Sequence, residues 1–90
     1  DRTTQIAQFE LYLEAARNPE LRPAAERWDS AYRDLIAAAL ERAGVADAAR
    51  RAPIVSASLV GLLLDHVAGN SSPAELRDQV VELIARFAAA

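Results

Sequence analysis

Apolar side chains recur at intervals of three and four residues along most of the chain, and no stretch alternates strictly between apolar and polar positions. A period near 3.6 residues is typical of amphipathic helices, whereas half-buried strands alternate with a period of two. Prolines and glycines interrupt the pattern and divide it into segments. We therefore predict an all-α fold, a small antiparallel helical bundle of four main helices over residues 4–17, 23–43, 47–68 and 73–88.

The boundaries between the predicted helices carry residues that commonly begin or end a helix. Asn18, followed by a proline, is suited to cap a short turn before the second helix, and Gly44 is suited to a left-handed C-terminal cap. Pro53 predicts a bend or a restart near the beginning of the third helix. Ser72 and Glu75 have the spacing of a capping box, so the fourth helix should begin directly after Ser72.

The second predicted helix is apolar on one side only. Its hydrophobic side chains fall within a stripe about 100° wide, and its charged side chains lie outside that stripe. One face of this helix should therefore be buried, and it consists of Ala25, Trp28, Tyr32, Leu35, Ile36 and Ala39.

The third and fourth helices are apolar over a wider arc, about 200° and 160° of their surfaces, which is more than one contact requires. A small monomer cannot cover such a surface, and a large uncovered apolar patch indicates association. We predict a closed twofold homodimer in which these two helices and their symmetry copies form a four-helix bundle. The predicted interface residues are Val55, Leu59, Leu62, Leu63, Val67, Leu76, Val80, Leu83 and Phe87.

The remaining side of the third helix has a different character. It carries small residues, Ala57, Gly61 and Ala68, which let another backbone approach closely, and Ser58 and Asp65 lie beside them.

Four aromatic side chains come from the first two helices: Phe9, Tyr12, Trp28 and Tyr32. Tyrosine and tryptophan combine an apolar body with one polar group, which suits a mostly apolar pocket with a few polar anchors. The same spacing also fits ordinary packing in a small helical core. The sequence leaves both interpretations open, a ligand pocket and a packed core.

Composition and charge restrict the classes of function. The 13 acidic residues exceed the 10 basic ones, all of which are arginine, and the net charge is −3. Binding the phosphate backbone of a nucleic acid requires clustered positive charge, so we do not expect this segment to bind DNA itself. Cysteine is absent, which rules out disulfides and thiolate ligands. The longest apolar stretch, residues 54–64, is too short and too interrupted to span a membrane.

The residue types of a hydrolase triad occur in the third helix, as Ser56, Ser58, Asp65 and His66. Adjacent residues on a helix do not face each other, so Asp65 cannot orient His66 as a triad carboxylate would. His66 is better explained as a histidine near the C-terminal end of a helix, where the dipole favours a positive charge. We therefore expect no enzymatic activity and no catalytic, metal-binding or cofactor-binding residue.

Residues 9–22 resemble the start of the C-terminal regulatory domain in TetR-family bacterial transcriptional regulators. In that family a similar helix ends in an Arg-x-Pro-x-Leu-Arg turn, here residues 17–22. The helix that contains Trp28 and Tyr32, the apolar segment 59–64 and the segment after Ser72 resemble the helices that follow in those domains. Many members have Asp-Gly where this chain has Val60-Gly61.

The resemblance implies a single regulatory domain over residues 1–90 of a cytoplasmic bacterial repressor, which dimerises and senses a small molecule. DNA would be bound by an N-terminal helix-turn-helix domain that we expect to precede this segment. The effector would be small and largely apolar, and would lie between the first two helices and the base of the third. The alternative from another class is a free-standing helical interaction module that binds no ligand.

Overall fold

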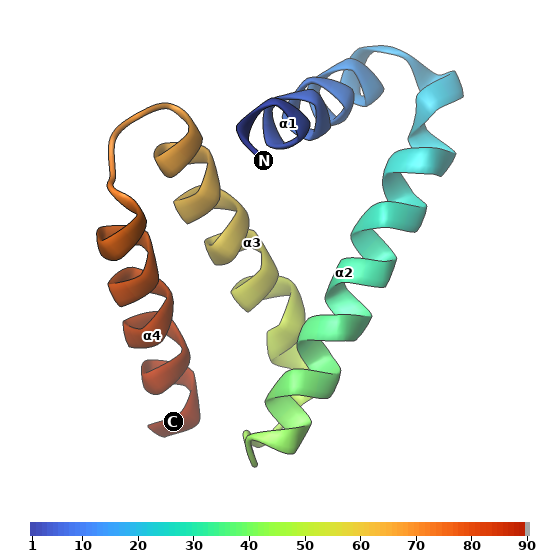
Figure 1. The fold of residues 1–90 in the computed structure, drawn as a ribbon. Helices are drawn as coiled ribbons and strands as arrows, with labels where there is room; N and C mark the ends of the chain where they lie inside the picture. Colours follow the sequence, from blue (N-terminus) through green and yellow to red (C-terminus); the bar gives the residue numbers. More distant parts are fainter. Residues whose placement is uncertain (90) are drawn as a thin grey trace. The chain divides into compact units, whose positions relative to one another are not determined.

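The computed structural model of the chain describes residues 1–89. Four α-helices and one short 3-10 helix follow one another, and the described residues contain no strand (Figure 1). This confirms the predicted all-α class. The elements are α1 (Arg2–Arg17), η1 (Pro19–Leu21), α2 (Arg22–Arg42), α3 (Ala48–Val67) and α4 (Pro73–Ala89).

The chain divides into two compact units, Asp1–Ala31 and Tyr32–Ala90, which meet within α2. The first unit contains α1, η1 and the beginning of α2, and the second contains the rest of α2 with α3 and α4. None of the helices among the described residues is long and apolar enough to cross a membrane.

Local capping bonds define both ends of α1. The Asp1 carboxylate accepts a hydrogen bond from the Thr4 amide at 3.0 Å, so the helix begins two residues earlier than predicted. At the other end, the Asn18 amide donates to the Glu14 carbonyl at 2.8 Å. The Asn18 side chain then caps η1 by accepting from the Glu20 amide at 3.1 Å, and Pro19 occupies the first position of η1. The predicted turn at Asn18 is thereby confirmed.

The turn from α2 to α3 is a Schellman motif. Gly44 has a positive φ of 79°, the left-handed conformation that glycine adopts without strain. Its amide donates to the Glu41 carbonyl at 3.0 Å, and the Val45 amide donates to the Leu40 carbonyl at 3.0 Å. The predicted glycine cap is confirmed, and it brings the buried side chains of Leu40 and Val45 into the core.

The core of the second unit lies where the last turns of α2 meet the first half of α3 and the end of α4. Two of its buried members are alanines on α3, which let the neighbouring helices approach closely. Half-buried apolar side chains from α2, α3 and α4 pack around this cluster. The buried cluster is Leu40, Val45, Ala48, Ala52 and Val55, and the surrounding residues are Ile36, Ala37, Leu59, Ile84 and Phe87.

The structure corrects the predicted buried face of α2. Trp28 and Leu35 are 51% and 61% exposed, and Tyr32 is exposed as well. The core of the second unit engages only the last two turns of α2, through Ile36 and Leu40 and their neighbours. The predicted burial of Trp28, Tyr32 and Leu35 is therefore wrong.

α3 continues through Pro53 as one helix, so the predicted restart does not occur. Proline lacks the amide that would bond the carbonyl four residues earlier, here that of Ala49. Ala49 is exposed, so water can satisfy that carbonyl near the beginning of the helix.

α3 and α4 lie side by side as a helical hairpin (Figure 1). At its closed end, the Glu75 amide donates to the Ser72 hydroxyl at 3.1 Å, and the Ser72 amide donates to the Glu75 carboxylate at 3.0 Å. This is the predicted capping box. Both bonds lower the pKa of Glu75 below 4.5, and the bond from the Ser72 backbone contributes more than the bond with the Ser72 side chain.

Candidate functional site

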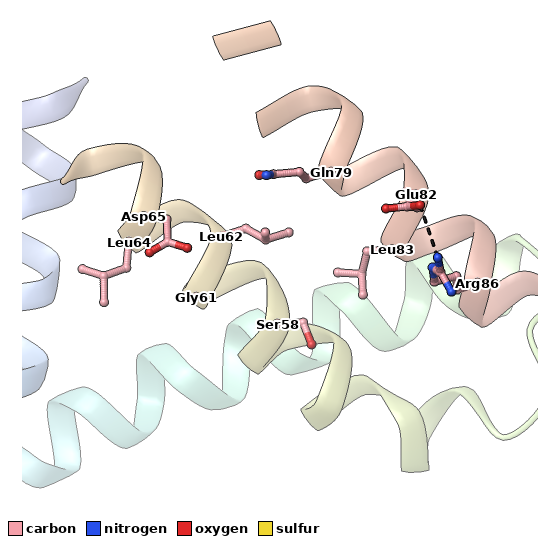
Figure 2. Close-up of a pocket in the computed structure, with 9 residues that line it drawn as sticks. All are labelled: Ser58, Gly61, Leu62, Leu64, Asp65, Gln79, Glu82, Leu83 and Arg86. Carbon is pink, nitrogen blue, oxygen red and sulfur yellow. Dashed lines mark hydrogen bonds and ion pairs between the residues drawn. The ribbon is translucent and has the colours of Figure 1, made fainter. Parts of the chain in front are cut away.

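A groove of about 580 Å³ runs between α3 and α4 on one side of the hairpin (Figure 2). Its residues recur at helical spacing, so each helix contributes one stripe. Leucines form the apolar part of the wall, and Gly61 leaves open space around the position of its missing Cβ. The lining residues are Ser58, Gly61, Leu62, Leu64 and Asp65 from α3, and Gln79, Glu82, Leu83 and Arg86 from α4.

The polar side chains of this groove are separated along its length. Glu82 and Arg86 form an ion pair at 3.3 Å toward one end, and Asp65 lies toward the other end (Figure 2). Ser58 donates to the Ile54 carbonyl of its own helix at 2.9 Å. The groove therefore has an apolar middle, the Glu82–Arg86 ion pair toward one end and the Asp65 carboxylate toward the other.

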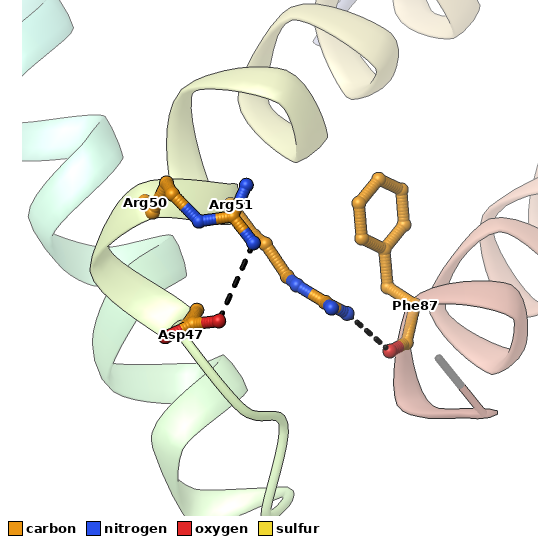
Figure 3. A network of polar contacts seen from close by, with 4 residues as sticks. All are labelled: Asp47, Arg50, Arg51 and Phe87. Atoms are coloured by element: carbon orange, nitrogen blue, oxygen red, sulfur yellow. Dashed lines mark hydrogen bonds and ion pairs between the residues drawn. The ribbon is translucent and has the colours of Figure 1, made fainter.

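A guanidinium closes the open end of the hairpin. Arg51, near the beginning of α3, donates from Nη1 to the Phe87 carbonyl at 3.3 Å (Figure 3). Carbonyls in the last turn of a helix have no partner within the helix, so this bond satisfies one of them and joins α3 to the end of α4. The neighbouring Arg50 instead pairs with Asp47 at 3.3 Å, at the start of α3.

The structure separates the predicted interface residues into three groups. Leu62 and Leu83 line the groove. Leu59 and Phe87 pack against the core of the second unit, and Val55 belongs to that core with 0% exposure. A side chain with no exposed surface cannot contact a partner, so Val55 is removed from the predicted interface. The others are Val67, which is buried, and the half-buried Leu63, Leu76 and Val80.

A smaller crevice of about 340 Å³ lies in the first unit, between α1 and the beginning of α2. The Tyr12 hydroxyl donates to the Asp29 carboxylate there at 2.5 Å, and the Arg22 Nε donates to the Ala15 carbonyl at 3.4 Å. Its lining is mainly small and charged: Tyr12, Ala15, Ala16, Arg22, Ala25, Glu26 and Asp29.

Of the four aromatic pocket candidates, Tyr12 alone lines this crevice. Phe9 is half-buried on α1, and Trp28 is half exposed on the beginning of α2. Tyr32 follows Trp28 by one turn of α2 and belongs to the second unit. Trp28 and Tyr32 thus share one exposed face of a single helix.

Two of the residues whose types occur in hydrolase triads, Ser58 and His66, form hydrogen bonds with nearby backbone carbonyls. His66 lies in the last turn of α3, as predicted, and its Nδ1–H donates to the Ser71 carbonyl at 2.9 Å. Ser56 is buried on α3. Within residues 1–89, no three histidine, aspartate or glutamate side chains form a group that could hold a metal ion.

The polar groove residues on α4, Gln79, Glu82 and Arg86, were absent from the predicted interface. Their signal was present as the spacing 79, 82, 83 and 86, which repeats the spacing 58, 61, 62 and 65 on α3. A search for apolar residues alone does not find this stripe, because Leu83 is the one apolar residue among these four positions of α4. The small side of α3 with Ser58, Gly61 and Asp65 was noted in the sequence, and it forms the α3 wall of the groove.

The described residues form an all-helical domain whose last two helices make a hairpin with a groove along one side. The family model described as tetracyclin repressor-like, C-terminal domain, matches residues 1–90. The chain therefore belongs to that family, and the resemblance to TetR regulators stated from residues 9–22 is confirmed. No curated protein and no solved structure matches the chain.

Proposed function

We propose that this domain is the regulatory module of a TetR-like transcriptional regulator in the bacterial cytoplasm. It forms a homodimer, senses a small and largely apolar effector, and thereby controls DNA binding by an N-terminal helix-turn-helix domain of the full-length protein. The observation that carries this proposal is the family match along all 90 residues. The same match favours a regulator over the alternative of a free-standing interaction module.

Dimerisation through α3 and α4 is supported by the groove on their hairpin. Leu64 is exposed, and it lies with Leu62 and Leu83 along one continuous depression. Apolar side chains grouped in this way usually mark an association surface. A twofold partner would cover both copies of the groove in one closed assembly.

Sedimentation equilibrium tests this interface. The wild-type domain should be a dimer at micromolar concentration, and Leu83→Glu should be a monomer, because an unpaired charge at a dry interface costs several kcal/mol. Val81→Glu is the matched control, since Val81 lies on the same helix, is 60% exposed and is outside the groove. A monomeric wild-type domain, or equal loss of dimer in both variants, would contradict the proposal.

Effector sensing is assigned to the aromatic side chains of the first unit. Tyr12 and Trp28 are both exposed there, and the crevice beside Tyr12 has a volume near the lower end of the range of ligand pockets, about 300 Å³. An apolar ligand could pack against these exposed aromatic rings beside the crevice. Phe9, half-buried on α1, would form part of the same site.

The single tryptophan reports on this site. The apolar dye ANS, used as a general probe, should quench Trp28 fluorescence and raise the melting temperature by mass action. Phe9→Ala and Trp28→Ala should weaken binding, whereas Leu64→Ala in the second unit should leave it unchanged. Equal binding by all three variants would show that the dye occupies another surface.

DNA binding is assigned to the N-terminal domain alone. The net charge of −3 predicts that the domain by itself shows no salt-dependent affinity for random duplex DNA. A steep decrease of affinity with salt, measured by fluorescence anisotropy, would reveal phosphate contacts and overturn this assignment.

A further inference from the structure

Two residues of the α3–α4 groove are unfavourable for the helix that carries them. Gly61 lies in the interior of α3, where alanine would stabilise the helix, and nothing lies within 4 Å of the position where a Cβ would be. Asp65 lies in the last turn of α3, where the helix dipole disfavours a negative charge. Within residues 1–89 the Asp65 carboxylate makes no hydrogen bond or ion pair, and only the Asp65 backbone carbonyl is engaged, by the Asn70 amide at 2.9 Å. The folded monomer therefore gives no physical reason for either residue.

The positions of the charges do give a reason when a second copy is considered. Arg86 lies toward one end of the groove and Asp65 toward the other (Figure 2). If the twofold axis crosses the groove at its middle, at right angles to its length, it exchanges the two ends between copies, so the Arg86 end of one copy meets the Asp65 end of the other. Leu62 and Leu83 would then meet their counterparts near the axis, where Gly61 allows a close approach.

We propose that Arg86 of each copy pairs with Asp65 of the partner subunit, and that these two symmetry-related pairs set the register and the self-selectivity of the dimer. This inference rests on the proposed dimerisation and names the residues that decide which partner is accepted. Charges at an interface suppress wrong partners mainly because like charges repel, which suits a regulator that must associate with its own copies.

The existing contact of Arg86 with Glu82 does not prevent this pairing. Both side chains are largely exposed, 75% and 68%, and exposed ion pairs on one helix contribute little. A guanidinium carries five N–H donors, and the bond to Glu82 uses Nη2. Arg86 can therefore keep Glu82 as a neighbour and still donate to a carboxylate of the second copy.

Two charge variants convert the homodimer into an obligate heterodimer. Asp65→Arg places arginine at both ends of the groove, and Arg86→Glu removes the guanidinium beside Glu82, so that only carboxylates remain at the two ends. Each variant alone should dimerise at least about tenfold more weakly than the wild type, because like charges meet twice. An equimolar mixture should recover the wild-type affinity, because every pair in the mixed dimer is again attractive.

The dissociation constants are measured by sedimentation velocity at low and at high salt, and the recovery in the mixture should shrink as salt screens the pairs. Arg77→Glu and Asp78→Arg are matched controls, since both residues are exposed on α4 outside the groove. These two variants should dimerise like the wild type, alone and mixed. Far-UV circular dichroism checks that each variant is folded, and Asp65→Asn with Arg86→Gln tests the pair without repulsion.

The outcomes separate the two proposals. A wild-type domain that dimerises, together with a mixture no tighter than either charge variant alone, overturns the Asp65–Arg86 pairing and leaves dimerisation standing. Equal effects from the control positions would also overturn it, since the loss would then follow net charge. A wild-type domain that stays monomeric overturns the proposed dimerisation and the pairing with it.

Discussion

The hydrogen bond from Tyr12 to Asp29 connects α1 to α2 within the first unit, and its removal gives a measurable loss of stability. Tyr12→Phe deletes one hydroxyl and leaves the ring in place. A hydrogen bond to a charged acceptor contributes about 1.5–3 kcal/mol to stability when it is shielded from water. Tyr12 is 44% exposed, so solvent screening reduces the expected loss to about 1 kcal/mol.

Urea unfolding measures this loss at a fixed protein concentration, because any dimer makes the apparent stability depend on concentration. For a small domain with a slope of about 1 kcal/mol per M, the midpoint should fall by about 1 M at unchanged slope. Tyr32→Phe is the matched control, since Tyr32 is similarly exposed and no hydrogen bond of its hydroxyl is described. A double-mutant cycle with Asp29→Asn isolates the coupling between the two side chains.

The reasoning fails if Tyr12→Phe and Tyr32→Phe lower the midpoint equally, or if the cycle shows no coupling. Either result would mean that the hydroxyl of Tyr12 exchanges its protein partner for water at no cost. The same variant also bears on the effector site, because a hydroxyl that bonds Asp29 is not free to anchor a ligand without losing that contact. Tyr12→Phe should therefore lower stability even when no effector is present.

Three further predictions follow from single contacts. The bonds with Ser72 lower the pKa of Glu75, so the ionised carboxylate stabilises the folded domain at pH values above 4.5. This stability is lost as the pH falls from 4.5 through the lowered pKa. Glu75→Gln should therefore make the melting temperature depend less on pH in this window. Arg51→Ala should lower the free energy of unfolding in urea by about 1 kcal/mol, whereas Arg50→Ala should change it little, because the ion pair of Arg50 with Asp47 is exposed. Val55→Ala should lower the free energy of unfolding measured by calorimetry by about 2 kcal/mol, since Val55 is fully buried and its truncation leaves a cavity. A change near zero would contradict the place of Val55 in the core.

Capping residues explain why the helix boundaries could be predicted from the sequence. Gly44 and the Ser72–Glu75 capping box act through bonds within a few residues, and both occur as predicted. Local chemistry of this kind does not depend on how the helices pack. The family could be recognised for a similar reason, because the turn after α1 is a short continuous segment.

The faces of the helices were harder to predict, because a wheel shows which residues share a side and not which side meets a neighbour. Trp28 and Leu35 share a stripe with Ile36, yet only the end of α2 reaches the core, so the first two remain exposed. The groove illustrates the opposite error. Its walls combine leucines with Asp65 and Arg86. A prediction from hydrophobicity alone places such a mixed stripe on the solvent-exposed side of the helix and misses the groove.

The α3–α4 hairpin is bonded at both ends, by the Ser72–Glu75 box where the chain turns and by Arg51 on the Phe87 carbonyl where it opens. The spacing of its two helices is therefore fixed before any partner arrives. Side chains in the groove such as Gly61, Asp65 and Arg86 can then change during evolution without refolding the hairpin, because the bonds that hold it lie elsewhere. Under the proposed dimerisation, two copies of this domain that arise by gene duplication could stop exchanging subunits through a few substitutions in the groove, while each kept its own fold.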